Sequence, residues 1–77
     1  MSTHPRIRAA LRTGAHDLSA FYPDRPFGEG DRLTLAAHLA DTADEQTTLL
    51  DVLPRTTSTT TRSTYAKALR RTAEARR

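Results

Sequence analysis

The chain has 77 residues, enough for one small domain over residues 1–77 but too short for a roomy enzyme cleft. It has no cysteine, which excludes disulfides, thiolate zinc sites and thiol redox couples. Its formal net charge is +3, with 12 Lys and Arg residues against 9 Asp and Glu. Large apolar residues are sparse, so we expect a thin core whose stability a partner or a second copy supplements.

The hydropathy pattern also bears on where the protein works. No uninterrupted apolar run approaches the roughly 18 residues of a membrane span. The N-terminal segment carries charged residues throughout, instead of the continuous apolar stretch of a signal peptide. The sequence therefore predicts a cytoplasmic protein with no membrane partner.

The first predicted helix covers residues 4–22, from His4 to Tyr22. Pro5 suits the first helical turn, and Pro23 marks the far end. Gly14 lowers the helix propensity of this segment, but it also permits a close crossing with another helix. Apolar and small residues recur at spacings of four and three, which places them on one helix face: Ile7, Leu11, Gly14, Leu18 and Phe21.

The second predicted helix covers residues 31–53 and follows "YPDRPFGEGD", whose prolines and glycines indicate a loop. Asp31 is expected to cap its first turn, and Pro54 to end it. This helix should be the longest, and its leucines should pack against the stripe of the first helix. The leucines proposed as an interaction stripe are Leu35, Leu39, Leu50 and Leu53.

The third predicted helix covers residues 61–76, after a run of hydroxyl residues that start helices better than they extend them. Tyr65 and Leu69 would lie on its narrow apolar face. Three helices joined by short connections, without strand alternation, predict an all-α fold. We expect a small three-helix bundle, or a helical hairpin with a third, basic helix.

Charge is distributed unevenly along the chain. Up to Pro54 acidic residues outnumber basic ones, whereas the segment from Arg55 onward holds seven Arg and Lys residues against Glu74. This basic end has three interpretations: pairing with the acidic second helix or plain solvation, contact with nucleic-acid phosphates, or contact with an acidic protein. For the nucleic-acid alternative, the candidate residues are Arg62, Lys67, Arg70 and Arg71.

No catalytic or cofactor motif stands out. His38, Asp41 and Glu45 would share one helix face and could hold a metal, but a solvated polar face explains them better. "GEG" before the second helix lacks the strand and lysine of a phosphate loop. The serines lack a partner base. We therefore expect no enzyme activity, no cofactor and no metal.

Two segments resemble known families. Ser58, Thr61, Tyr65 and Leu69 follow the order S-x-x-T-x-x-x-Y-x-x-x-L, which resembles the opening helix of the core-binding domain of tyrosine recombinases. "AAHLADTADEQTTLLDVLP" and the closing "EARR" are similar to small helical proteins of GC-rich bacteria, some labelled as natural-product biosynthesis proteins without a known activity. The second resemblance implies a helical fold and an accessory role.

These observations together favour a non-catalytic helical accessory protein that binds another protein. Self-association through the middle helix is one form that this interaction can take. The alternative is a small DNA-binding regulator that uses the basic C-terminal helix.

Overall fold

A computed structural model describes residues 5–75. His4 and Arg76, the outermost residues of the first and third predicted helices, lie outside the described residues, as does Arg77. Over the described range the protein forms four α-helices and no strand longer than an isolated bridge, so the all-α prediction is confirmed. The helices are α1 (Pro5–Ala20), α2 (Glu29–Leu39), α3 (Ala43–Val52) and α4 (Arg62–Ala75).

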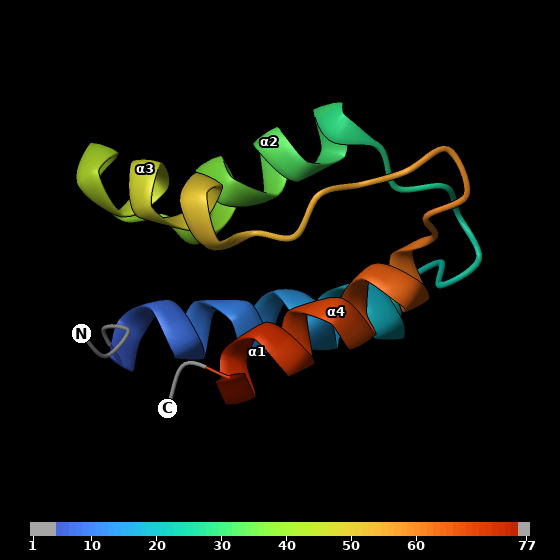
Figure 1. The fold of residues 1–77 in the computed structure, drawn as a ribbon, viewed down its shortest axis with the longest axis horizontal. Helices are drawn as coiled ribbons and strands as arrows, with labels where there is room; N and C mark the ends of the chain where they lie inside the picture. The colour runs from blue at the N-terminus through green and yellow to red at the C-terminus, as the bar shows by residue number, and fades with distance from the viewer. Residues whose placement is uncertain (1–4, 76–77) are drawn as a thin grey trace.

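The helices form two layers, as Figure 1 shows. One layer is the antiparallel pair α1 and α4, and the other consists of α2 followed by the shorter α3. The segment after α3 runs back along the second layer to the start of α4. Between residues 5 and 75, no helix is long and apolar enough to cross a membrane.

The continuous helix predicted over residues 31–53 is wrong, because the chain bends between Leu39 and Ala43. Ala40 is extended, with φ −85° and ψ 138°, and Thr42 caps a new helix by accepting a hydrogen bond from the Glu45 amide. Glu45 in turn accepts from the Asp41 amide at 2.9 Å. These side chains satisfy amides that would otherwise be unpaired at a helix start, so "DTADE" encodes a new N-terminus.

Packing explains why the bend is favoured. A straight helix from Glu29 to Val52 would be about 36 Å long, against about 24 Å for α1, at 1.5 Å per residue. One end would therefore extend past the first layer with its leucines exposed. The bend returns Leu49 and Leu53 to the core, where 1% and 4% of their surfaces remain exposed. The longest described helix is consequently α1, not the middle segment.

Asp31 does not take the predicted cap position. Helix α2 begins two residues earlier, at Glu29, with Gly28 as its N-cap. Asp31 then lies in the first turn, and its carboxylate accepts a hydrogen bond from the Gly28 amide at 2.9 Å. The carboxylate therefore still stabilises the start of the helix, although it belongs to the first turn and not to the N-cap position.

Phe21 was expected in the core but is 58% exposed. Helix α1 ends at Ala20, and Tyr22 has a positive φ of 53°, so the chain turns away before Phe21 can continue the stripe. Phe27, which the sequence places in a loop, is buried instead. Its ring stacks on Tyr65 with centroids 4.4 Å apart.

The core lies between the two layers, and small residues let α1 and α4 approach closely. Ala15, Ala66 and Ala73 are buried among the leucines. Gly14 allows the close contact expected of it, since an added Cβ would lie 3.2 Å from a Leu39 methyl and 3.4 Å from a Leu69 methyl. The buried apolar residues are Ile7, Leu11, Ala15, Leu18, Phe27, Ala36, Leu49, Leu53, Tyr65, Ala66, Leu69 and Ala73.

Tyr65 joins the irregular segments to the core. Its side chain is 1% exposed, and its hydroxyl donates a 2.6 Å hydrogen bond to the Pro54 carbonyl. Nearby, the Phe27 amide bonds the Thr60 carbonyl at 2.9 Å, and the Arg62 amide bonds the Arg25 carbonyl at 2.9 Å. Both long connections are thus fixed to the start of α4.

The hydroxyl run before α4 starts the helix, as predicted. Thr61 and Thr64 exchange hydrogen bonds between each amide and the other hydroxyl, at 2.8 and 3.3 Å. This arrangement reproduces a capping box, with threonine in the position that glutamate commonly takes.

Filling the space at Gly14 should destabilise the fold. We expect Gly14→Leu to lower the free energy of unfolding by about 2–3 kcal/mol, because three leucine methyl groups already occupy that space. The neighbouring residue Thr13 is exposed and provides a control. Thr13→Leu should change the free energy of unfolding by less than about 0.5 kcal/mol. Urea unfolding measures both, and equal effects would contradict the close crossing.

Tyr65 should make stability fall at high pH. Burial raises the pKa of Tyr65 from its ordinary 10.0 to about 12, opposed by Arg32 and reinforced by Glu29. Its contribution is therefore complete below pH 10 and is lost between pH 10 and about 12, by up to about 2–3 kcal/mol. Urea unfolding across this range should show the loss.

Tyr65→Phe is the matched control for that titration. It should cost about 1 kcal/mol at neutral pH, because the Pro54 carbonyl loses its donor. The variant should also lack the tyrosine component of the alkaline loss. Identical pH profiles for the two proteins would show that Tyr65 is accessible to solvent.

Candidate functional site

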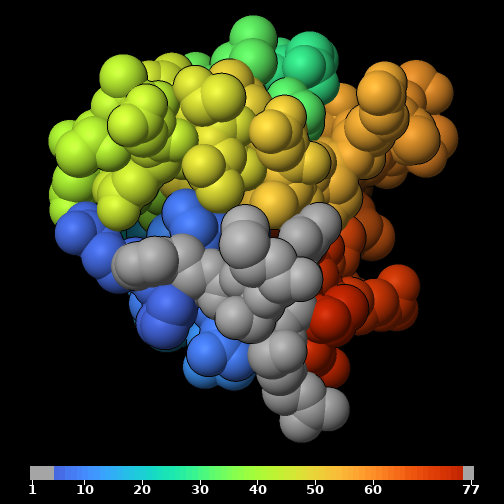
Figure 2. Space-filling model, turned by 60° about the vertical axis from the view of Figure 1, so that its left-hand side comes forward, coloured from blue at the N-terminus to red at the C-terminus, as the bar shows by residue number. Residues whose placement is uncertain are grey.

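The two layers carry opposite charge. Helices α1 and α4 hold seven basic residues and two acidic ones, whereas residues 29–52 hold six acidic residues and one arginine. In the space-filling view of Figure 2, the α2–α3 layer (green to yellow) lies above α1 and α4 (blue and red). The uneven charge along the sequence is therefore also a separation in space.

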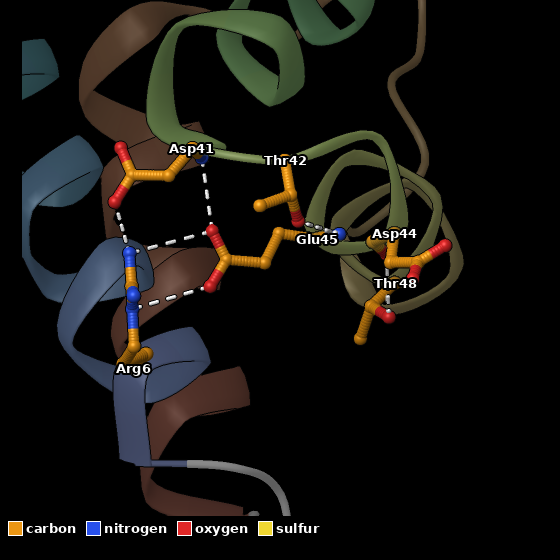
Figure 3. A network of polar contacts seen from close by, with 6 residues as sticks. All are labelled: Arg6, Asp41, Thr42, Asp44, Glu45 and Thr48. Carbon is orange, nitrogen blue, oxygen red and sulfur yellow. Dashed lines mark hydrogen bonds and ion pairs between the residues drawn. The ribbon is translucent and has the colours of Figure 1, made fainter.

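One ion cluster connects the layers, at the bend between α2 and α3 (Figure 3). Arg6 on α1 pairs with the carboxylate of Asp41, and its Nε lies 3.1 Å from a carboxylate oxygen of Glu45. Asp41 and Glu45 thus pair with α1. Within residues 5–75 no ion pair joins the acidic segment to α4, so the described residues fit the solvation of the basic helix and not its pairing with the acidic segment.

The four basic candidates on α4 do not form one cluster. The Arg62 Nε donates to the Phe21 carbonyl at 2.8 Å, which holds Arg62 on the side of α4 that faces the α1–α2 loop. Arg70 donates to the Ser19 hydroxyl at 3.1 Å. Lys67 and Arg71 are exposed and have no hydrogen bond or ion pair with another described residue. Arg62 is consequently separate from the other three.

The leucine stripe proposed for interaction is largely used within the molecule. Leu53 is buried, and Leu35, Leu39 and Leu50 are half-buried against the core. The exposed large apolar residues of the described chain lie elsewhere: Phe21, Tyr22 and Leu33.

A groove of about 390 Å³ opens between the C-terminal end of α1 and the outer turns of α2. Its floor is apolar, formed by Leu18, Phe27 and Leu35. Exposed Phe21 stands at its edge, and its rim is polar: Asp17, Asp31, Thr34, His38 and Arg62. Of the residues named from the sequence as candidates for binding or metal ligation, this surface brings together Leu35, His38 and Arg62.

The groove combines an apolar floor with a rim of charged and hydroxyl side chains. A serine nucleophile is absent from its lining, and Tyr65 lies in the core with its hydroxyl bound to Pro54. His38 is separated by the bend from Asp41 and Glu45, which bind Arg6, and residues 5–75 contain no group of three possible metal ligands. An apolar floor with a mixed polar rim instead matches the usual anatomy of a protein interface.

The chain matches no protein-family model, no curated protein and no solved structure.

Arg32 is a structural feature that the sequence pattern did not suggest. Its side chain is only 13% exposed, and it contacts Glu29 at 3.2 Å while donating to the Leu50 carbonyl at 2.9 Å. It therefore joins α2 to the last turn of α3, where a cation also opposes the helix dipole favourably. Arg32 lies eighteen residues before Leu50 in the chain, so no local sequence pattern indicates this contact.

The two phenylalanines at the groove should differ in their effect on stability. Phe21→Ala should change the free energy of unfolding by less than about 0.5 kcal/mol, because most of the side chain is already in water. Phe27→Ala should cost about 3–5 kcal/mol, because it removes a buried ring stacked on Tyr65. Thermal unfolding measures both. A large loss for Phe21→Ala would make Phe21 a structural residue rather than part of a binding surface.

Proposed function

We propose that this chain is a non-catalytic helical interaction protein that holds a protein partner in the groove between α1 and α2. The observation that carries this proposal is the exposed Phe21 at the edge of an apolar floor. Exposing a phenylalanine gains nothing for the fold, whereas buried aromatic anchors dominate the energetics of protein interfaces.

The partner that fits is a segment with an apolar anchor and polar flanks. The floor of Leu18, Phe27 and Leu35 takes the anchor, and the rim then surrounds it and excludes water. Leu35 thereby keeps the interaction role proposed for the middle helix, whereas buried Leu53 cannot take part. No cofactor or metal enters this function.

A second copy of the chain is one form of partner. The groove is open and its rim carries both Asp17 and Arg62, so the same surface on two molecules offers opposite charges. Sedimentation at high micromolar concentration distinguishes the two cases. A dimer that Phe21→Ala dissociates supports self-association, and a strict monomer leaves a different protein as the partner.

Site-specific photo-crosslinking tests the location of the partner. Thr34 lines the groove, while Thr47 is an exposed threonine on α3 outside it. Both hydroxyls bond the carbonyl four residues earlier, at 3.0 and 3.1 Å, so replacing either with a photoreactive residue removes an equivalent contact. When each variant is irradiated inside cells of the organism that encodes the chain, position 34 should give a discrete crosslinked adduct, and position 47 should not.

The adduct should also disappear when Phe21→Ala is added, with the protein still folded. Adducts of the same mass and yield from both positions would contradict a specific groove. A position-34 adduct unchanged by Phe21→Ala would remove the aromatic anchor from the proposal.

A further inference from the structure

The outer side of the basic layer forms a second surface, distinct from the groove. Lys67, Arg70, Arg71 and Glu74 are spaced by three and four residues, which places them on one side of α4. Arg12 of α1 meets Arg70 and Glu74 across a hollow of about 260 Å³ between the two helices. Four cations and one carboxylate therefore share a face made by two helices.

The fold does not neutralise these cations. The six acidic residues of positions 29–52 lie in the other layer, and Asp17 lines the groove. Among residues 5–75 the ion pairs formed by arginine involve Arg6 and Arg32, which are not on this face. Lys67, Arg71, Arg12 and Arg70 are all exposed, so their positive charges remain available.

We propose that this face binds the phosphate backbone of duplex nucleic acid. A row of cations without an internal ion pair gains affinity by displacing the counterions that surround a phosphate chain. Arg12 and Arg70 present guanidinium groups that suit phosphate oxygens, and the Ser19 hydroxyl orients Arg70. Arg62 is not part of the surface, because the Phe21 carbonyl holds it near the groove.

The same residues argue against a lipid bilayer as the partner. Peripheral membrane binding by a helix needs large apolar side chains that enter the bilayer beside the basic ones. On the described part of the chain the exposed large apolar residues are Phe21, Tyr22 and Leu33, none of which lies in α1 or α4. A phosphate polymer in solution fits the face better.

The surface predicts binding without sequence preference. Two antiparallel helices present a broad side with Arg and Lys as its contacts, and contacts to phosphates carry no direct sequence information. Four phosphate contacts predict that the logarithm of the affinity falls with the logarithm of salt with a slope of about −3 to −4. Affinity for a random duplex should thus fall about 100-fold between about 50 and about 200 mM salt.

Two double variants with equal charge loss test the location. Lys67→Ala with Arg71→Ala removes two cations from the face, whereas Arg25→Ala with Arg55→Ala removes two exposed cations outside the four helices. Fluorescence anisotropy with a random duplex should show about tenfold weaker binding and a slope reduced by about 2 for the first variant only. Equal weakening in both variants would overturn the proposal, since net charge alone would then explain the binding.

A gain of affinity provides a result that misfolding cannot imitate. Glu74→Gln removes the carboxylate from the hollow beside Arg12 and Arg70 and should tighten duplex binding about threefold. No binding by the parent chain at low salt, or equally tight binding to vesicles of phosphatidylserine and phosphatidylcholine, would overturn the inference. The Phe21→Ala variant should bind the duplex unchanged, which separates this face from the groove.

Discussion

The contact on which the fold depends is the buried pair of Tyr65 and Phe27. The layers meet over a core with few large side chains, so each one carries a large share of the apolar burial. Tyr65 adds a hydrogen bond to the Pro54 carbonyl, and Phe27 lies in the connection from α1 to α2. One aromatic pair therefore fixes both connecting segments against α4, and through them the position of the α2–α3 layer.

The close packing of α1 on α4 explains the chemistry of the surface. Buried alanines lie on both helices, and Gly14 leaves room for the methyl groups of Leu69 and Leu39. The remaining positions face water and are free to carry charge. Because the basic positions fall on this pair and the acidic ones on α2 and α3, the molecule has two differently charged sides joined by the cluster at Arg6.

The sequence predicted those features that depend on local spacing. The stripe of Ile7, Leu11 and Leu18, the first turn at Pro5 and the threonine start of α4 follow from helix periodicity and capping alone. A capped helix with two buried residues four apart also produces the spacing of Thr61, Tyr65 and Leu69 on which the resemblance to the recombinase helix rests.

Features that depend on the fold were missed or misplaced. The bend had a local signal, since Thr42 and Glu45 match the spacing of a capping box, but the leucine period across it suggested one helix. The core contains Phe27 and not the predicted Phe21, because the chain turns at Tyr22 with a positive φ. The sequence gives no signal of that turn. The groove could not be read from spacing, because its lining comes from α1, α2, α4 and a loop.

Helix α1 places the two proposed binding surfaces on separate sides of the molecule. Asp17 and Leu18 line the groove toward α2, while Arg12 faces α4 and the hollow with Glu74. A partner in the groove would therefore leave the basic face uncovered, and a duplex on the basic face would leave Phe21 accessible. Since the Tyr65 and Phe27 pair holds both layers in place, each surface can be occupied without the fold having to change for the other.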